Sequence, residues 1–112
     1  LRGDRINTIA HFLRATILLE QGNSAEAEAA LRRALYLEPD FVAAHLILGQ
    51  TARAAGRAAV ADRHLRTTLR LVSALDPQAV LPETDGMTAG RMAETLALLV
   101  ADGPFIPAGP LR

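Results

Sequence analysis

The sequence repeats itself at an offset of 34 residues, and this period restricts the possible folds more than any other feature. Small residues and leucines recur at the same phase in the two copies, as in the pairs Gly22 and Gly56, Ala27 and Ala61, Leu31 and Leu65, Leu35 and Leu69, Leu37 and Leu71, and His11 and His45. A period of this length with these residue types is typical of arrays whose unit is a pair of antiparallel helices. We therefore predict an all-α fold of two stacked helical hairpins.

The two units resemble tetratricopeptide repeats, in which a bulky residue, a Leu-Gly pair and an alanine lie at fixed spacing. The second unit has these types at His45, Leu48, Gly49, Ala61 and Leu65. Gly22 and Gly56 lie where the first helix of each unit must end in a left-handed turn. The resemblance assigns the first repeat to about residues 8–41 and the second to about residues 42–75.

Helical periodicity predicts a fifth helix after the two hairpins. The predicted helices span residues 6–21, 24–37, 41–55, 58–73 and 88–101, and Asn23 and Asp40 are suitable N-caps for the second and third. Prolines and a glycine interrupt residues 76–87, so a loop precedes the fifth helix. That helix has one apolar stripe, formed by Met92, Leu96, Leu99 and Val100. We expect it to cap a single domain covering residues 1–112, and the tail of residues 102–112 to be extended.

Composition excludes several classes of function. The chain has 112 residues and no net charge, with twelve basic residues, all arginine, against twelve acidic ones. This balance argues against a general nucleic-acid binder.

No cysteine is present, which excludes disulfides and thiolate metal sites and suits a cytoplasmic protein. No apolar stretch approaches the roughly 20 residues that cross a membrane, so we expect no membrane insertion. Because the first residue is Leu1, we also expect the sequence to be part of a longer protein.

In tetratricopeptide repeats the first helix of each hairpin lines a concave groove. The repeat phase assigns to this groove the residues Ile9, Phe12, Leu13, Thr16, Leu19, Leu46, Ile47, Gln50 and Arg53. The groove is apolar with a polar end, which suits an apolar helix face or an extended segment of a partner protein. Alternatively, the chain's own terminal segments or a second copy cover it, because a continuous apolar patch is seldom left bare.

Charge is unevenly distributed along this neutral chain. Residues 41–75 contain five arginines and one aspartate, a net charge of +4, whereas residues 20–40 have a net charge of −3. Arg63, Arg66 and Arg70 recur at helical spacing on one face of the fourth predicted helix. This face is either a solvated outer surface or a docking patch for an acidic partner.

The sequence has no recognisable catalytic or metal-binding pattern. His11 and His45 fall at a packing position of the repeat, and neither is followed by a histidine or carboxylate four residues later. His64 is expected to be solvated beside Arg63. No recognisable nucleophile or strand-linked glycine turn occurs. We therefore predict no catalytic residue, no metal site and no cofactor in this chain.

Two groups of segments are more specific than the repeat pattern. They are Leu35-Tyr36-Leu37-Glu38-Pro39-Asp40-Phe41, followed by Ala44-His45, Leu48-Gly49 and Arg63-His64-Leu65, and the closing run Leu81-Pro82-Glu83-Thr84-Asp85-Gly86-Met87-Thr88-Ala89-Gly90-Arg91. Both groups resemble the tetratricopeptide region of CheR-type chemotaxis receptor methyltransferases. The resemblance covers about residues 30–95. It implies a parent enzyme that transfers a methyl group from S-adenosylmethionine to chemoreceptor glutamates, with a catalytic and cofactor-binding domain that lies outside this chain.

The resemblance implies that this chain is a non-catalytic interaction module that positions or regulates the methyltransferase. Its protein partner is then a chemoreceptor, a response regulator or the methyltransferase domain itself. Two alternatives remain open. One is a self-association module that forms a homo-oligomer through the apolar groove and the cap helix. The other is an independent scaffold that binds an acidic partner through its arginine face.

Overall fold

The computed structural model describes residues 2–101, and the side chains of residues 5–100. Within this range the chain forms five α-helices and no β-strand, which confirms the predicted all-α fold. The helices are α1 (Arg2–Glu20), α2 (Ser24–Leu37), α3 (Val42–Ala54), α4 (Ala58–Ser73) and α5 (Ala89–Ala101). α1 begins earlier than the periodicity indicates, and the other bounds agree to within one residue. The predicted extended tail lies outside the described residues.

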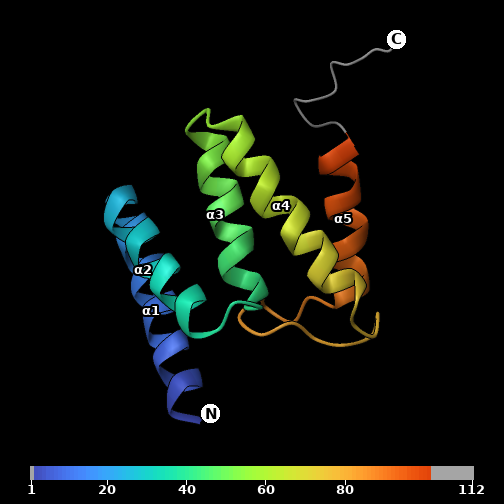
Figure 1. The fold of residues 1–112 in the computed structure, drawn as a ribbon, viewed down its shortest axis with the longest axis horizontal. Coiled ribbons are helices and arrows are strands. Elements are labelled where there is room, and N and C mark those ends of the chain that lie inside the picture. Colours follow the sequence, from blue (N-terminus) through green and yellow to red (C-terminus); the bar gives the residue numbers. More distant parts are fainter. Residues whose placement is uncertain (1, 102–112) are drawn as a thin grey trace.

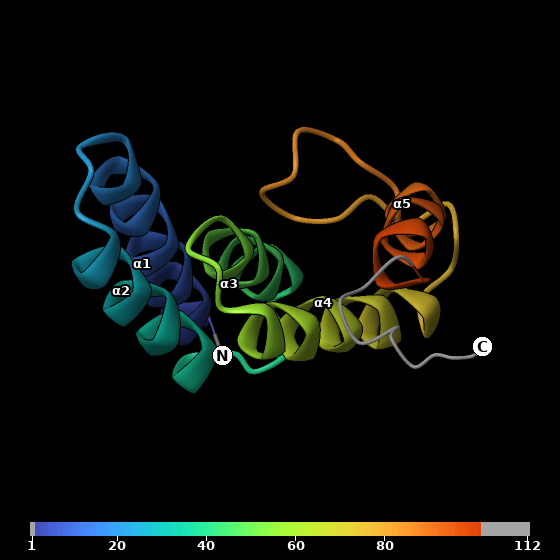
Figure 2. The ribbon, with the colours of Figure 1, turned by 90° about the horizontal axis from the view of Figure 1, so that it is seen from above.

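The helices form two antiparallel hairpins and a cap. α1 packs against α2 and α3 against α4, while α2 also packs against α3 and so joins the two hairpins. α5 packs against α4 and stands at the end of the row (Figure 1). Seen from above, α1, α3 and α5 lie toward one side of the molecule and α2 and α4 toward the other (Figure 2). The first helices of the hairpins therefore form one layer and the second helices another.

The two hairpin turns have the same backbone structure. Gly22 and Gly56 have φ angles of 82° and 80°, the left-handed conformation that the sequence predicts for them. In each turn the residue after the glycine donates its N–H to the carbonyl five residues earlier, at 2.8 Å for Asn23 and 2.9 Å for Arg57. This is the six-to-one hydrogen bond of helices that end in glycine. The two halves are therefore copies in backbone hydrogen bonding as well as in sequence.

The N-cap predicted for α2 is correct in position but makes no side-chain cap, and the N-cap predicted for α3 is wrong. Asn23 does occupy the N-cap position of α2, but its side chain makes no capping hydrogen bond. The N-cap position of α3 is Phe41 rather than Asp40, and it also lacks a side-chain cap. The start of α3 is instead held by packing, since Phe41 is buried in the core. Here burial decides where the helix begins, and the capping preference of Asp40 does not.

The hydrophobic core consists of two clusters that meet at the start of α3. In the first, which joins α1, α2 and α3, the rings of Phe12 and Phe41 pack edge to face with centroids 5.3 Å apart. The second joins α3, α4, α5 and the loop before α5, and it contains Val42 and Leu96. Phe41 and Val42 are adjacent in sequence but enter different clusters. The start of α3 therefore fixes the first hairpin and the cap relative to each other.

α5 covers the second hairpin through the stripe that the sequence indicates. Met92, Leu96 and Val100 are buried, and Leu99 packs against the same cluster from a half-buried position. Burying these side chains removes apolar surface from water at the end of the stack, which is the role expected of a terminal element in a helical repeat array.

The loop between α4 and α5 has a well-defined backbone. The N–H of Gly90 donates to the carbonyl of Pro77 at 2.9 Å, and a Cβ on Gly90 would lie only 3.0 Å from the Cβ of Pro77. Thr88 caps α5, because its hydroxyl accepts a hydrogen bond from the N–H of Arg91 at 3.2 Å. Gly86 adopts a φ of 83° within the turn. Several residues of segment 81–91, which carries the family resemblance, therefore have a role in folding this loop.

Candidate partner-binding surface

Phe12 is the main correction to the predicted groove. Its side chain is 4% exposed and packs on Phe41 in the first core cluster, so it is not accessible to a partner. The repeat phase gives the angular position of a residue around its helix. It does not tell how far a neighbouring hairpin reaches over that position, and here Phe41 at the start of α3 covers it.

The two predicted groove residues in the middle of α3 are also largely used by the fold. Ile47 is half-buried and packs against the first cluster. Leu46 is half-buried and packs against the second cluster, to which the loop before α5 contributes Leu81. In Figure 2 this loop lies on the same side of the molecule as α3 and α5. Part of the predicted groove is therefore occupied by the chain's own packing.

The remaining predicted groove residues stay at least partly accessible. Ile9, Thr16 and Leu19 are half-buried, and Leu13, Gln50 and Arg53 are exposed. The hydroxyl of Thr16 donates to the carbonyl of Leu13 at 2.7 Å, so this side chain already has a hydrogen bond within α1. The accessible surface is thus narrower than the sequence predicts. It runs along α1 from Ile9 to Leu19, and on α3 it is confined to the C-terminal end, at Gln50 and Arg53.

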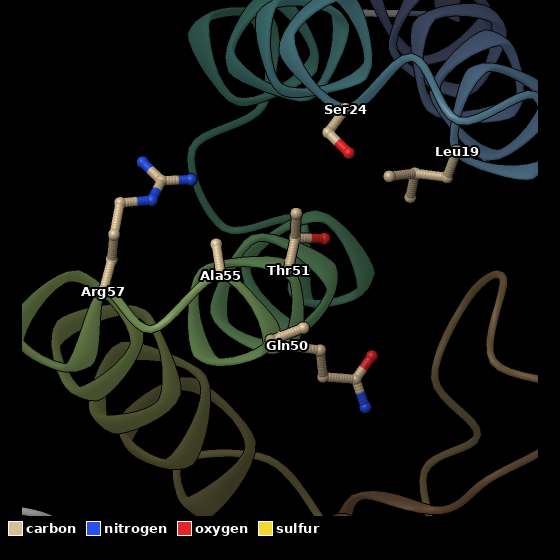
Figure 3. Close-up of a pocket in the computed structure, with 7 residues that line it drawn as sticks. Leu19, Ser24, Gln50, Thr51, Ala55 and Arg57 are labelled. Carbon is tan, nitrogen blue, oxygen red and sulfur yellow. The ribbon is translucent and has the colours of Figure 1, made fainter.

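An open pocket of about 430 Å³ lies between the two hairpins at this end. Leu19 of α1 and Gln50 of α3, both predicted groove residues, line it from opposite sides (Figure 3). Ala54 lines it as well. The pocket also contains four residues that the groove prediction missed: Ser24, Thr51, Ala55 and Arg57. The repeat period could have revealed them, because it places both hairpin turns at the same edge of the stack.

An ion pair links the hairpins beside this pocket. The guanidinium Nη2 of Arg57 donates to Oε2 of Glu28 at 3.0 Å, and Arg32 lies 3.8 Å from the same oxygen. The side chain of Arg57 is 44% exposed, so part of its guanidinium still faces solvent. The pocket therefore combines an apolar lining with an amide and a cation, a combination suited to an apolar side chain next to a hydrogen-bond acceptor.

The predicted basic face on α4 is present but partly neutralised. Arg63, Arg66 and Arg70 are exposed. The Nε of Arg66 donates to Oδ2 of Asp62 at 2.8 Å, one helical turn away. This pair reduces the positive charge that the face offers to an acidic partner.

His64 is half-buried, contrary to the expectation that it is solvated. Its Nδ1 lies 3.4 Å from Nδ1 of His45, whose Nε2 is 2.8 Å from the carbonyl oxygen of Pro39. Burial, and next the neighbouring His45, lower the pKa of His64 below its ordinary value. The repeat period pairs His45 with His11 in sequence, and only the antiparallel packing of α3 on α4 brings His64 to it. Among the described residues, no group of three or more histidine or acidic side chains is placed to hold a metal ion.

Comparison with protein families identifies the first hairpin. The family model for the tetratricopeptide repeat matches residues 8–41. Residues 8–41 form a tetratricopeptide repeat. Tetratricopeptide repeats generally mediate protein–protein interactions, and their helical fold is typically non-catalytic. No curated protein and no solved structure matches the chain. The match concerns the tetratricopeptide repeat alone and carries no information about a methyltransferase.

Between residues 2 and 101, no helix combines the length and apolar composition needed to cross a bilayer.

Proposed function

We propose that this chain is a protein-interaction module that binds its partner in the open pocket between the two hairpins. The observation that supports this is the position of the pocket, where Leu19 and Gln50 of the predicted groove meet at the junction of the repeats. The expected ligand is a helical or extended segment that places an apolar side chain beside Leu19 and Ala54. A carboxylate or carbonyl of the same segment then faces Arg57, which lines the pocket.

We further propose that this module positions or regulates a chemoreceptor glutamate methyltransferase. The support is the resemblance of segment 81–91 and of the repeats to the region found in CheR-type enzymes. On this proposal the partner is a chemoreceptor, a response regulator or the methyltransferase domain itself, and all of them meet in the cytoplasm. S-adenosylmethionine binds in the catalytic domain, and this chain needs no cofactor.

The test is a titration of isotope-labelled chain with each of the three purified candidate partners, followed by NMR. One partner should shift the backbone signals of Leu19, Gln50, Thr51 and Arg57. Shifts confined to other parts of the chain would overturn the pocket assignment. If none of the three partners binds, the methyltransferase proposal is wrong. The pocket could then still bind another protein.

Variants that introduce a negative charge make the same test sharper. The variant Gln50→Glu should weaken binding by about tenfold or more, because it places a carboxylate in the pocket where the partner presents an acceptor. Tyr36→Glu is the matched control, since Tyr36 is 86% exposed on α2, outside the pocket. Equal weakening by the control would show that the partner does not use the pocket.

Self-association is the second candidate function. Apolar side chains are exposed on α1, where Ile6 is 68% exposed, and on the cap helix α5, where Leu98 is 70% exposed. If these surfaces pair, the mass measured by light scattering rises with protein concentration. A mass that stays at one chain over a dilution series removes this candidate.

A basic docking face is tested separately, because binding through Arg63 and Arg70 must weaken strongly with added salt.

A further inference from the structure

The histidine pair between α3 and α4 brings two ring nitrogens opposite each other. The Nδ1 atoms of His45 and His64 are 3.4 Å apart, with ring centroids 5.6 Å apart and ring planes tilted by 39°. This separation is long for a hydrogen bond. A tetrahedral zinc ion with Zn–N bonds of about 2.0–2.1 Å holds two ligand nitrogens about 3.3–3.4 Å apart. The spacing of the pair is therefore that of two ligands on one ion.

The other nitrogen of His45 is already fixed in the orientation that a metal ligand needs. Its Nε2 lies 2.8 Å from the carbonyl oxygen of Pro39. A carbonyl oxygen only accepts, so Nε2 carries the hydrogen and Nδ1 of the neutral ring has a free lone pair. Metal-binding histidines commonly donate their second ring N–H to a backbone carbonyl or a carboxylate in this way. His45 is thus oriented toward His64 before any ion binds.

We propose that His45 and His64 bind a divalent transition-metal ion, Zn²⁺ above all, through their Nδ1 atoms, with water completing the coordination. The hydrogen of the neutral His64 ring then resides on Nε2, so that both Nδ1 lone pairs face the ion. Imidazole nitrogen suits zinc, copper and nickel, whereas magnesium and calcium prefer oxygen. The bound ion cross-links α3 to α4 and holds the second hairpin closed.

The surroundings of the pair set the expected affinity. Arg63 and Arg32 lie close enough to disfavour an added positive charge, whereas Glu28 favours it. With two protein ligands among the described residues instead of four, the site is much weaker than a structural zinc site. We expect a dissociation constant on the order of tens of micromolar. Arg63→Gln should tighten binding, because it removes a neighbouring cation.

The first hairpin supplies a matched control. His11 is the counterpart of His45 one repeat earlier, but the counterpart of His64 is Ala30. His11 therefore occupies the same repeat position without a histidine at the partner position. Replacing His11 tests whether any histidine at this phase binds zinc.

The first experiment is calorimetric titration of the untagged chain with zinc chloride at neutral pH. One ion per chain should bind, and His45→Gln or His64→Gln should each weaken binding by about tenfold or more. His11→Gln should leave the affinity unchanged, and circular dichroism establishes that each variant is folded. No zinc binding by the wild-type chain, or equal weakening by His11→Gln, would overturn the proposal.

A second measurement on the wild-type chain does not depend on how the variants fold. Zinc should shift the ring ¹⁵N signals of Nδ1 in His45 and His64 and leave those of His11 in place. Magnesium chloride should shift none of them. Zinc-induced shifts at Nε2 instead of Nδ1, or of the same size in all three histidines, would also overturn the site.

Discussion

Gly49 on α3 faces Leu65 on α4 so closely that there is no room for a side chain at position 49. A Cβ there would lie 2.8 Å from Cδ2 and 2.9 Å from Cγ of Leu65, which is itself buried. This contact explains why the repeat pattern has a small residue at this position. Because α3 and α4 approach each other at this point, the distance between these two helices depends on the absence of a side chain at Gly49.

Gly49→Val should lower the free energy of unfolding by about 1–3 kcal/mol, because the added methyl groups force Leu65 to move in a packed core. Urea denaturation measures the change. In a chain that already carries Leu65→Ala, the same valine should cost at least about 1 kcal/mol less, since the space has been vacated. Additive effects of the two substitutions would contradict the contact.

Phe12→Ala and Leu13→Ala should lower the stability by very different amounts, although the residues are adjacent and the repeat phase assigns both to the groove. Phe12 is buried against Phe41, so its truncation should cost about 3–5 kcal/mol of stability. Leu13 is 47% exposed, so its truncation should cost about 1 kcal/mol or less. Chemical denaturation of the two variants measures this difference, and similar costs would show that Phe12 is not in the core.

Gly90→Ala should destabilise the cap helix. The new Cβ would lie 3.0 Å from the Cβ and 3.1 Å from the carbonyl oxygen of Pro77, and the backbone of Pro77 yields less easily than a side chain. A loss of about 1–3 kcal/mol is expected despite the better helix propensity of alanine. Ala97→Val, on an exposed position of α5, is the control and should change the stability by about 0.5 kcal/mol or less. A neutral Gly90→Ala would show that the loop is not packed on α5.

Thr88→Ala should cost about 0.5–2 kcal/mol, because it removes the hydroxyl that accepts the N–H of Arg91 at the start of α5. Thr88→Ser keeps that hydroxyl and should retain most of the stability. Hydrogen exchange at the amide of Arg91 reports the cap directly. If serine and alanine are equally destabilising, the threonine methyl matters and the cap does not.

Stability of the metal-free chain should fall as the pH is lowered through about 6.5. The pKa of His64 is lowered in the folded chain, first by burial and then by His45, so in this window the unfolded chain binds more protons than the folded one. The free energy of unfolding therefore decreases with falling pH and levels off below the lowered pKa. His64→Gln should flatten this dependence when unfolding is measured with a chelator present, and an unchanged slope would assign it to other groups.

The sequence by itself determined the helices, the hairpins and the cap. These features depend on local backbone requirements and on one-sided burial, which are visible as left-handed glycines at Gly22 and Gly56, a repeat period and an apolar stripe. The identity of the repeat also followed from residue types at fixed spacing. Such signals need no knowledge of which other segment lies nearby.

Only the tertiary structure decided which of the predicted groove residues face solvent and which side chains meet. Phe12 is covered because Phe41 reaches it from the next hairpin, and His64 meets His45 because two helices pack antiparallel. The pocket between Leu19 and Gln50 arises in the same way, from residues of separate hairpins. The angular phase of a residue is fixed by its own helix, whereas its burial and its partners are fixed by the depth and direction of packing from elsewhere in the chain.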